Sequence, residues 1–507
     1  MSGDEKKCVL GIDVGTTSVK SVLLNHEGVI LASAMKEYAL DSGPNDICEV
    51  HPDTYWNITC QVIRGVIAEA KINPESVKGL AFSSQGETLI VVDADGKPIR
   101  KAIVWLDNRS TAEAKEIEDQ FGNQLIMDIT GQPEVVPTWP ATRILWLKKN
   151  EPDTFCRAFK YLLVEDYLMY KMTGNYHTEH SLISSTLYFN ISKKIWWTEM
   201  LEFIGISTDQ LPQINSSGTS IGTLTIKAAK ETGLSTRTQC VTGAYDHPAG
   251  AIGSGSIHPG DVTLTIGGSM AMCVSMDKPL TDLALKLPCQ CHAVEGLYFL
   301  LPYGQTAGMV LRWFRDEFCG DEVRKARNKG LDAYDLIVEK AVKIAPGSDG
   351  LVMLPHLMGA GSPEFNPEAK GVFAGIKMGM TRAHFTRAIL ESVVFMVNRN
   401  IQIMKEQGII IRDINVLGGG SKSRLWIQIL ADVTTIPVNT LMISDNAATG
   451  AALLAGVGAG LFDDLNAACQ ISIKSHTLIE PDPLMHEHYK INYNKYLHLY
   501  QSLESFW

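Results

Sequence analysis

The sequence predicts an α/β protein built from two similar halves. Residues 7–36 have the pattern of three short strands joined by turns, and residues 260–303 repeat this plan with a strand, a turn of glycine and hydroxyl residues, and further strands. A chain of 507 residues is also too long for one ordinary core. We therefore expect two domains, at residues 1–255 and 256–507.

Each half continues into helices. In the first half, apolar residues at helical spacing predict a helix over 53–70, and an apolar run predicts a buried strand over 77–83. In the second half the clearest helix is predicted over 382–407, with Thr381 as its N-cap. The middle third predicts a helix-rich insertion beside the sheet, with helices over 141–149, 162–173 and 196–204.

The composition is that of a globular protein whose partners are small molecules or proteins. Hydrophobic residues make up 45% and charged residues 20%, and a formal net charge of -11 gives nucleic acid nothing to bind. The N-terminal segment lacks the apolar core of a signal peptide, and residues 447–462 suit a tightly packed helix better than a membrane span. We expect a cytoplasmic protein without a membrane partner, and the sequence leaves a homodimer open.

The ten cysteines are scattered without the spacing of a disulfide scaffold, which favours a reducing compartment. Cys289, Cys291 and His292 lie close together in the sequence, but no second ligand pair follows at zinc spacing. The alternation in this segment favours a strand, so we expect no metal site there.

The segment from Asp13 to Ser18 has two interpretations. Glycine and threonine are common in turns, so Gly15, Thr16 and Thr17 fit an ordinary hairpin. The same residues fit a loop that holds a phosphate, because a glycine turn brings backbone N–H groups close to an anion. The corresponding turn of the second half consists of Gly267, Gly268 and Ser269.

A third glycine-rich turn joins an apolar strand to a helix and consists of Gly418, Gly419, Gly420 and Ser421. Such a turn lets backbone N–H groups and the positive end of the helix approach a phosphate or a nucleotide, although it also serves packing alone. Its sequence matches neither the dinucleotide fingerprint nor the Walker-type loop. No dinucleotide fingerprint follows the first strand either. A nicotinamide oxidoreductase is therefore the weakest of the three hypotheses considered for this chain, after the two described below.

These turns together would place a triphosphate between the two halves. Asp13 could then orient Mg²⁺ through water, since Mg²⁺ keeps several waters when it bridges to substrate phosphates. A phosphoryl acceptor needs a carboxylate to remove its hydroxyl proton, and the candidate is Asp246, two residues before Pro248 at the start of an expected helix. The alternative is that Asp246 only caps that helix. Its position at the joint between the halves favours the base.

The sequence resembles the FGGY family of carbohydrate kinases over nearly the whole chain. The order and spacing of several short segments carry the resemblance: 11–18, 102–109, 142–147, 243–250, 265–269, 354–359 with 371–373, and 418–423 with 430–432. It implies two actin-like, that is ribonuclease-H-like, domains with a cleft between them, which close on ATP, Mg²⁺ and a sugar or polyol.

The resemblance also implies a role for each turn. The acid matching Asp246 is the catalytic base, and the acids matching Asp13 and Asp246 lie by the metal. The first domain binds the acceptor, and the second binds ATP. The phosphates face Gly15, Thr16, Thr17, Gly267, Gly268 and Ser269, and the adenosine lies along Gly418, Gly419, Gly420 and Ser421. The first turn is then a hairpin whose tip binds phosphate.

The acceptor is less closely defined. Glycerol kinases of this family carry Arg-Glu where this chain has Gly86-Glu87, and the loss of the arginine is expected to open volume for a longer polyol or a ketose. Xylulokinases carry Met-His there, so a xylulose-like ketose leads without a complete match. The candidate acceptor contacts are Glu87, Trp105, Asp107, Trp139, Asp246 and His247; ordinary packing is an equal alternative for Trp105, Trp139 and His247.

Other acceptors and one other class of protein stay open at this point. Residues 308–316 and 418–438 also resemble autoinducer-2 kinases, but the acceptor loop in the first domain of those kinases differs from this one. Ala360-Gly361 replaces the Glu-Arg that carbohydrate kinases of this family usually carry. Tetritols and pentitols are further acceptors. The rival class is a non-catalytic actin-like switch that binds ATP and closes without phosphotransfer.

Overall fold

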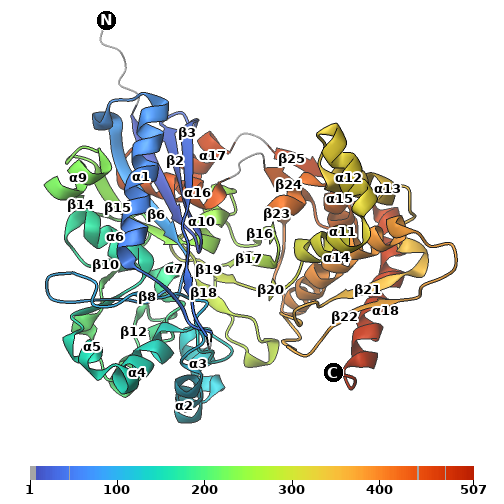
Figure 1. Ribbon diagram of the computed structural model, residues 1–507, viewed down its shortest axis with the longest axis horizontal. Helices are drawn as coiled ribbons and strands as arrows, with labels where there is room; N and C mark the ends of the chain where they lie inside the picture. Colours follow the sequence, from blue (N-terminus) through green and yellow to red (C-terminus); the bar gives the residue numbers. More distant parts are fainter. Residues whose placement is uncertain (1–6, 45, 442–444, 474–475) are drawn as a thin grey trace, which may run out of the picture.

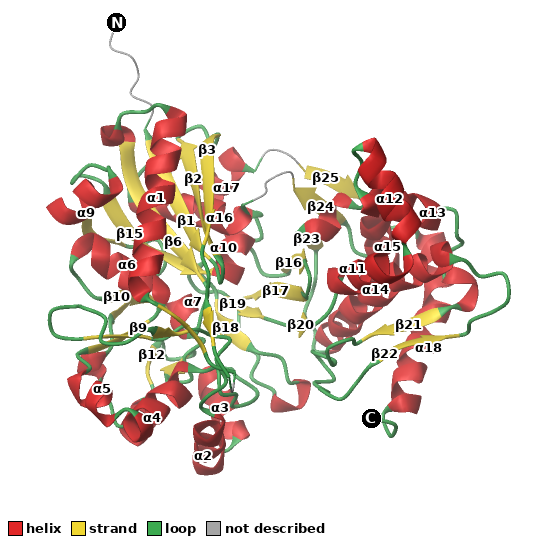
Figure 2. Cartoon of the chain, viewed as in Figure 1, coloured by secondary structure: helices red, strands yellow, loops and turns green. Residues whose placement is uncertain are grey.

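The computed structural model describes residues 7–44, 46–441, 445–473 and 476–507, and it contains two sheets that lie side by side (Figure 1). Helices pack around both sheets, as Figure 2 shows by colour. No helix within the described ranges is long and apolar enough to cross a bilayer. The predicted α/β class is confirmed.

The first sheet has the order β14-β15-β6-β1-β2-β3. Its central strand β6 runs parallel to β1 and to β15, and the remaining pairs are antiparallel. The strands are β1 (Cys8–Val14), β2 (Ser18–Asn25), β3 (Ile30–Glu37), β6 (Val77–Ser84), β14 (Ser220–Thr223) and β15 (Gln239–Tyr245). Helices α1 (Pro52–Ala70) and α6 (Val164–Thr173) pack against this sheet, and α9 (Ile226–Thr232) packs against these two helices.

The second sheet repeats the same plan. Its order is β18-β19-β17-β16-β23-β24-β25, with β23 parallel to both β16 and β24 and with β20 paired to β17. The strands are β16 (Asp261–Ile266), β17 (Met270–Met276), β18 (Cys289–Cys291), β19 (Tyr298–Leu300), β20 (Tyr303–Gly304), β23 (Asp413–Leu417), β24 (Val438–Leu441) and β25 (His476–Ile479). The expected repeat is therefore present in space.

The expected third strand over 296–303 is two strands, β19 and β20. Pro302 separates them, because proline has no N–H to donate to a ladder. The long helix α14 (Arg382–Glu406) agrees with the prediction, and the Thr381 backbone N–H donates to His384 Nδ1 at 3.0 Å before it. Further helices of this half, besides α16 described below, are α11 (Gly308–Phe318), α12 (Gly320–Lys329), α13 (Ala333–Ala341), α15 (Arg424–Thr434), α17 (Leu465–Ser472) and α18 (Pro483–Leu503).

The middle third forms the expected helix-rich insertion with its own apolar cluster, which includes Leu145, Tyr161, Tyr188 and Met200. The helix expected over 162–173 begins only at Val164, because the Asp166 carboxylate accepts the Leu163 N–H at 2.8 Å. The insertion contains α2 (Thr111–Phe121), α3 (Asn123–Thr130), α4 (Pro140–Asn150), α5 (Pro152–Arg157), α7 (His180–Ile183) and α8 (Thr198–Ile204). Short ladders complete the chain: β4 (Asp41–Ser42), β5 (Cys48–Val50), β7 (Ile90–Val92), β8 (Ala102–Ile103), β9 (Lys160–Leu162), β10 (His177–Glu179), β11 (Phe189–Asn190), β12 (Ile195–Trp196), β13 (Gln213–Asn215), β21 (Val352–Pro355) and β22 (Gly371–Ala374).

Two equivalent helices cross between the sheets. Helix α10 (Asp246–Gly253) follows β15, and α16 (Asn446–Gly458) follows β24 and lies against β1, β6 and β15 of the first sheet. A Cβ on Gly253 would lie 1.9 Å from the Asn446 carbonyl oxygen, and a Cβ on Gly450 would lie 1.9 Å from the Ala249 carbonyl oxygen. The contact is therefore reciprocal, backbone against backbone. Tight packing of residues 447–458 agrees with the expected packed helix.

This crossing predicts that Gly450→Ala destabilises the protein, although alanine normally stabilises a helix. The added methyl has to push the two backbones apart, and we expect a loss of about 3 kcal/mol in the free energy of unfolding, measured by urea titration. Gly320→Ala is the matched control, because a Cβ at Gly320 meets no atom within 4 Å. Equal stability of the two variants would contradict the close crossing.

Candidate active site

Three carboxylates gather where the parallel strands of the first sheet end. Strand β1 pairs with β6 through Asp13 and Ser83, and β15 pairs with β6 through Tyr245 and Ser84. Asp13, the loop with Glu87, and Asp246 therefore lie at one sheet edge, the edge at which open α/β sheets bind ligands. The Asp246 charge raises the pKa of both other acids.

Asp246 is the first residue of α10 and does not cap it. Tyr245 is the N-cap residue, without a side-chain cap bond. The Asp246 side chain is 37% exposed as a whole, yet its Oδ1 is inaccessible and has no hydrogen-bond partner. Burial raises the pKa of Asp246, and the adjacent His247, whose Nε2 lies 3.8 Å from Oδ1, acts in the opposite direction. Because the side chain as a whole is partly exposed, the Asp246 carboxylate can meet an acceptor hydroxyl at this edge.

Asp13 lies at the end of β1 and accepts a hydrogen bond from Ser83 Oγ at 2.9 Å. Burial and the Asp246 charge raise the pKa of Asp13 to about 6. In the described part of the chain no group of three or more His, Cys, Asp or Glu side chains could hold a metal ion. One or two carboxylate oxygens at an anion site nevertheless fit Mg²⁺, which prefers oxygen ligands and keeps most of its waters.

The first glycine turn is held by aromatic side chains. Gly15 N–H donates to the Ser18 carbonyl at 3.0 Å, and the Tyr38 hydroxyl donates to the Gly15 carbonyl. Trp105 Nε1 donates to Thr16 Oγ1 at 2.9 Å, which leaves the threonine O–H free to donate to a ligand. Thr17 at the tip is exposed.

The two glycine turns of the second sheet lie next to each other. Strands β16 and β23 pair through Thr265 and Leu417, so both turns start at the same edge. Gly418 has a φ of +82°, and a Cβ there would lie 2.7 Å from the Ile266 carbonyl oxygen, so only glycine fits. In the neighbouring turn, Gly267 N–H donates to the Ser269 carbonyl at 3.0 Å. Gly268, Gly419, Gly420 and Ser421 complete the two turns.

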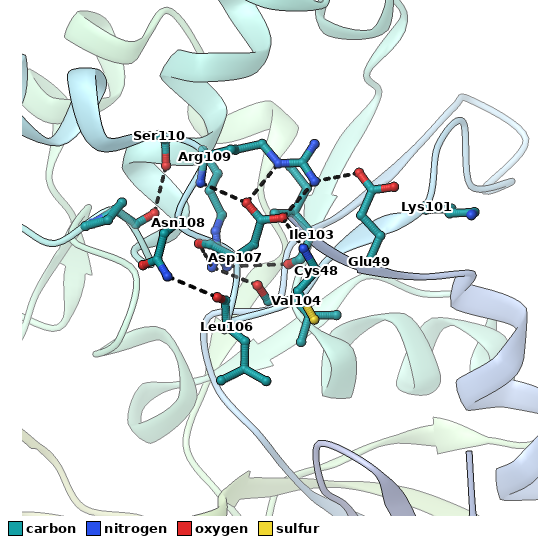
Figure 3. Close-up of polar contacts among 12 residues, drawn as sticks. Cys48, Glu49, Lys101, Ile103, Val104, Leu106, Asp107, Asn108, Arg109 and Ser110 are labelled. Atoms are coloured by element: carbon teal, nitrogen blue, oxygen red, sulfur yellow. Dashed lines mark hydrogen bonds and ion pairs between the residues drawn. The ribbon is translucent and has the colours of Figure 1, made fainter. Parts of the chain in front are cut away.

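Asp107 is held in a buried ion pair (Figure 3). Its carboxylate accepts hydrogen bonds from the Cys48 N–H at 2.7 Å, from the Arg109 N–H at 3.0 Å, and from Arg109 Nε and Nη2 at 2.8 and 2.7 Å. Although burial opposes it, this set lowers the pKa of Asp107 overall. With both oxygens occupied, Asp107 positions its loop, and its direct contact with an acceptor stays a prediction. Trp139, whose Nε1 donates to the Glu134 carbonyl at 3.2 Å, packs on the insertion.

Arg143 is a residue of the site that sequence reasoning did not single out. It is fully buried on α4 and donates to the carbonyls of Glu87 at 2.6 Å, Val104 at 2.8 Å and Asp107 at 3.1 Å. It thereby joins the loops that carry most of the acceptor candidates. A single arginine within a helical pattern carries no signal of such a role, because its partners are backbone carbonyls remote in sequence.

The volume expected from Gly86 is not free. A Cβ on Gly86 would lie 2.9 Å from Ser185 Oγ and 3.0 Å from Cε2 of Tyr245. The expectation that glycine opens the acceptor site is therefore corrected, because an aromatic ring from β15 already lies against this position.

The fold and these acid and glycine turns define a two-domain phosphotransferase of the actin-like class. Residues 8–253 match the N-terminal domain, and residues 262–459 the C-terminal domain, of the FGGY family of carbohydrate kinases. The chain belongs to this family. It is an enzyme of ATP-dependent sugar phosphorylation, which sets aside the non-catalytic switch and the oxidoreductase.

Similar proteins cover almost the whole chain. The xylulose kinase of Bacillus subtilis (strain 168) is 29% identical over 97% of this chain and 97% of its own length. The gluconokinase of the same organism is 30% identical over 93% of this chain and 92% of its own. The crystal structure of xylulose kinase from Rhodospirillum rubrum superimposes with a TM-score of 0.91 at 26% identity, and covers 98% of this chain and 99% of that one.

Glu87 makes the stability of the ligand-free protein pH-dependent. Burial and the Asp246 charge raise the pKa of Glu87 from 4.5 to about 8. Between these values the unfolded chain has released a proton that the folded protein keeps, so stability falls as the pH rises. We expect Glu87→Gln to flatten this decline in a series of thermal melts from pH 5 to about pH 9. Glu368→Gln, at an exposed glutamate, should keep the wild-type slope; an unchanged slope in Glu87→Gln would contradict the assignment.

The ion pair of Figure 3 predicts a large effect of Asp107→Asn. The new amide places N–H donors against the Arg109 and Cys48 donors, and breaking a buried pair costs about 3 kcal/mol or more. Urea unfolding should show this loss, together with a raised KM for the acceptor. Asp95→Asn removes an exposed pair with Lys97 and should cost less than about 1 kcal/mol. A similar small cost at Asp107 would argue against its positioning role.

Proposed function

We propose that the protein transfers the γ-phosphoryl group of ATP to a hydroxyl of a neutral ketose or polyol, with xylulose as the leading acceptor. The observation that carries this proposal is the meeting of Asp13, Glu87 and Asp246 at the ends of three neighbouring strands. In this proposal residues 1–255 bind the acceptor and residues 256–507 bind ATP.

In the proposed mechanism the partly exposed carboxylate of Asp246 removes the proton of the acceptor hydroxyl. The Thr16 hydroxyl, with Gly15 and Thr17, binds the transferring phosphoryl group from one side. Gly267, Gly268 and Ser269 bind the phosphates from the other sheet, and the adenosine lies along Gly418, Gly419, Gly420 and Ser421. Asp13, with Asp246 near it, would hold Mg²⁺ through water molecules. When bound, the Mg²⁺ ion would neutralise negative charge on the phosphates.

The charges favour a neutral acceptor over gluconate. A carboxylate on the acceptor would add a negative charge to the three acids of this edge. Besides His247 next to Asp246, two cationic side chains act on those acids and both are engaged: Arg143 donates to carbonyls, and Lys20 pairs with Asp445 at 3.5 Å. Xylulose is preferred among neutral acceptors because xylulose kinases lead the curated relatives. Tetritols, pentitols and autoinducer-2 are the alternatives.

The test measures ADP release with a coupled assay across glycerol, tetritols, pentuloses, pentitols, hexuloses, gluconate and autoinducer-2. We expect release to depend on a neutral acceptor and Asp246→Asn to lower kcat by at least about 100-fold, while ATP binding persists. The matched control is Asp332→Asn, which changes an aspartate that caps α13 through the Tyr334 N–H at 2.9 Å. Near-normal turnover of Asp246→Asn would remove the base assignment.

A further inference from the structure

The Tyr245 ring lies inside the proposed acceptor site, directly before the proposed base. Tyr245 is the last residue of β15, where it pairs with Ser84, and it is 7% exposed. Its ring centroid lies 5.1 Å from that of His247, edge to face. Tyr245 therefore lies at the edge of the first sheet where the three carboxylates meet.

The surroundings of the ring come from both sheets. Burial raises the pKa of Tyr245 well above its usual value, and the charges of Glu87, Asp246 and Cys273 act in the same direction. Glu87 and Asp246 belong to the first sheet edge, and Cys273 lies on β17 of the second sheet. The ring therefore lies near the acids of the first sheet edge and belongs to a buried cluster that includes Cys273 of the second sheet.

Gly86 and Tyr245 form a complementary pair. A Cβ on Gly86 would lie 2.9 Å from Ser185 Oγ, 3.0 Å from Cε2 and 3.5 Å from Cδ2 of the ring, so a side chain at residue 86 would press on Ser185 and on the ring. The Tyr245 ring therefore lies directly against the glycine that precedes Glu87.

The ring is also anchored. The Tyr245 N–H donates to Ser181 Oγ at 3.0 Å, and the Ser181 hydroxyl donates to the Glu179 carboxylate at 2.8 Å. The side chain belongs to a buried apolar cluster that includes Phe189, Met270 and Met272. An aromatic side chain packed in this way does not swing aside at low cost when a longer ligand enters.

We propose that Tyr245 is the specificity-determining residue of the acceptor site: with its ring over Gly86, it limits the length of the neutral ketose or polyol that can present a hydroxyl to Asp246. The inference rests on the proposed function. It assigns a preference for five-carbon over six-carbon acceptors, because the ring takes up space beside Glu87 that a longer acceptor would need. A single methylene in a shaped pocket changes kcat/KM by roughly 10- to 200-fold.

The experiment compares kcat/KM for pentuloses and hexuloses in the wild-type protein and in variants of Tyr245. We expect Tyr245→Ala to raise the hexulose-to-pentulose ratio at least about tenfold, and Tyr245→Phe, which keeps the ring, to leave the ratio within about twofold of wild type. Tyr188→Ala removes another buried ring of the same domain and should lower stability without changing the ratio.

A double-mutant cycle tests the contact itself. Gly86→Ala alone should reduce kcat/KM for pentuloses, because its Cβ meets the ring, and should cost far less in the Tyr245→Ala background. Additive effects, an unchanged ratio in Tyr245→Ala, or loss of all activity in a folded Tyr245→Ala protein would overturn the proposal. These outcomes differ from failure of the proposed function, in which the wild-type protein phosphorylates no neutral acceptor.

Discussion

The backbone contact between α10 and α16 is the constraint on which the rest of the site depends. Glycines at positions 253 and 450 let the two helices touch without side chains between them. The same α10 begins at Asp246, so the contact that joins the halves also fixes the proposed base at their joint. A wider crossing would move Asp246 away from either the Asp13 edge or the turns of the second sheet.

Burial of the three acids at this joint lowers the stability of the folded protein. Burial raises the pKa of Asp13, Glu87 and Asp246 together, which means that each carboxylate loses hydration that no cation fully replaces. Asp107 is a contrast, because its Arg109 partner and backbone donors lower its pKa despite burial. Acids whose pKa values are raised in this way are characteristic of functional sites, where ligands supply the missing interactions.

The acceptor side depends on packing between segments that are distant in the sequence. Arg143 on α4 holds the carbonyls of Glu87 and Val104, and Tyr245 on β15 fills the space left by Gly86. Both residues lie within segments that carry the family resemblance, 142–147 and 243–250, but each acts through the elements that surround it. Differences in acceptor choice between relatives of similar sequence are therefore expected to arise from such pairs.

The sequence by itself determined the repeated plan of strand, turn and strand, the glycine turns, and an aspartate at the start of a helix near the joint. These features depend on local periodicity and on turn chemistry, which a linear pattern carries. Only the tertiary structure decided that α16 packs on the first sheet, that Asp107 is already paired, and that Tyr245 occupies the space beside Gly86. The physical reason is that the side chain that fills a given space can come from an element distant in the sequence. In a closely packed interior, one aromatic ring can fill the space that a glycine leaves.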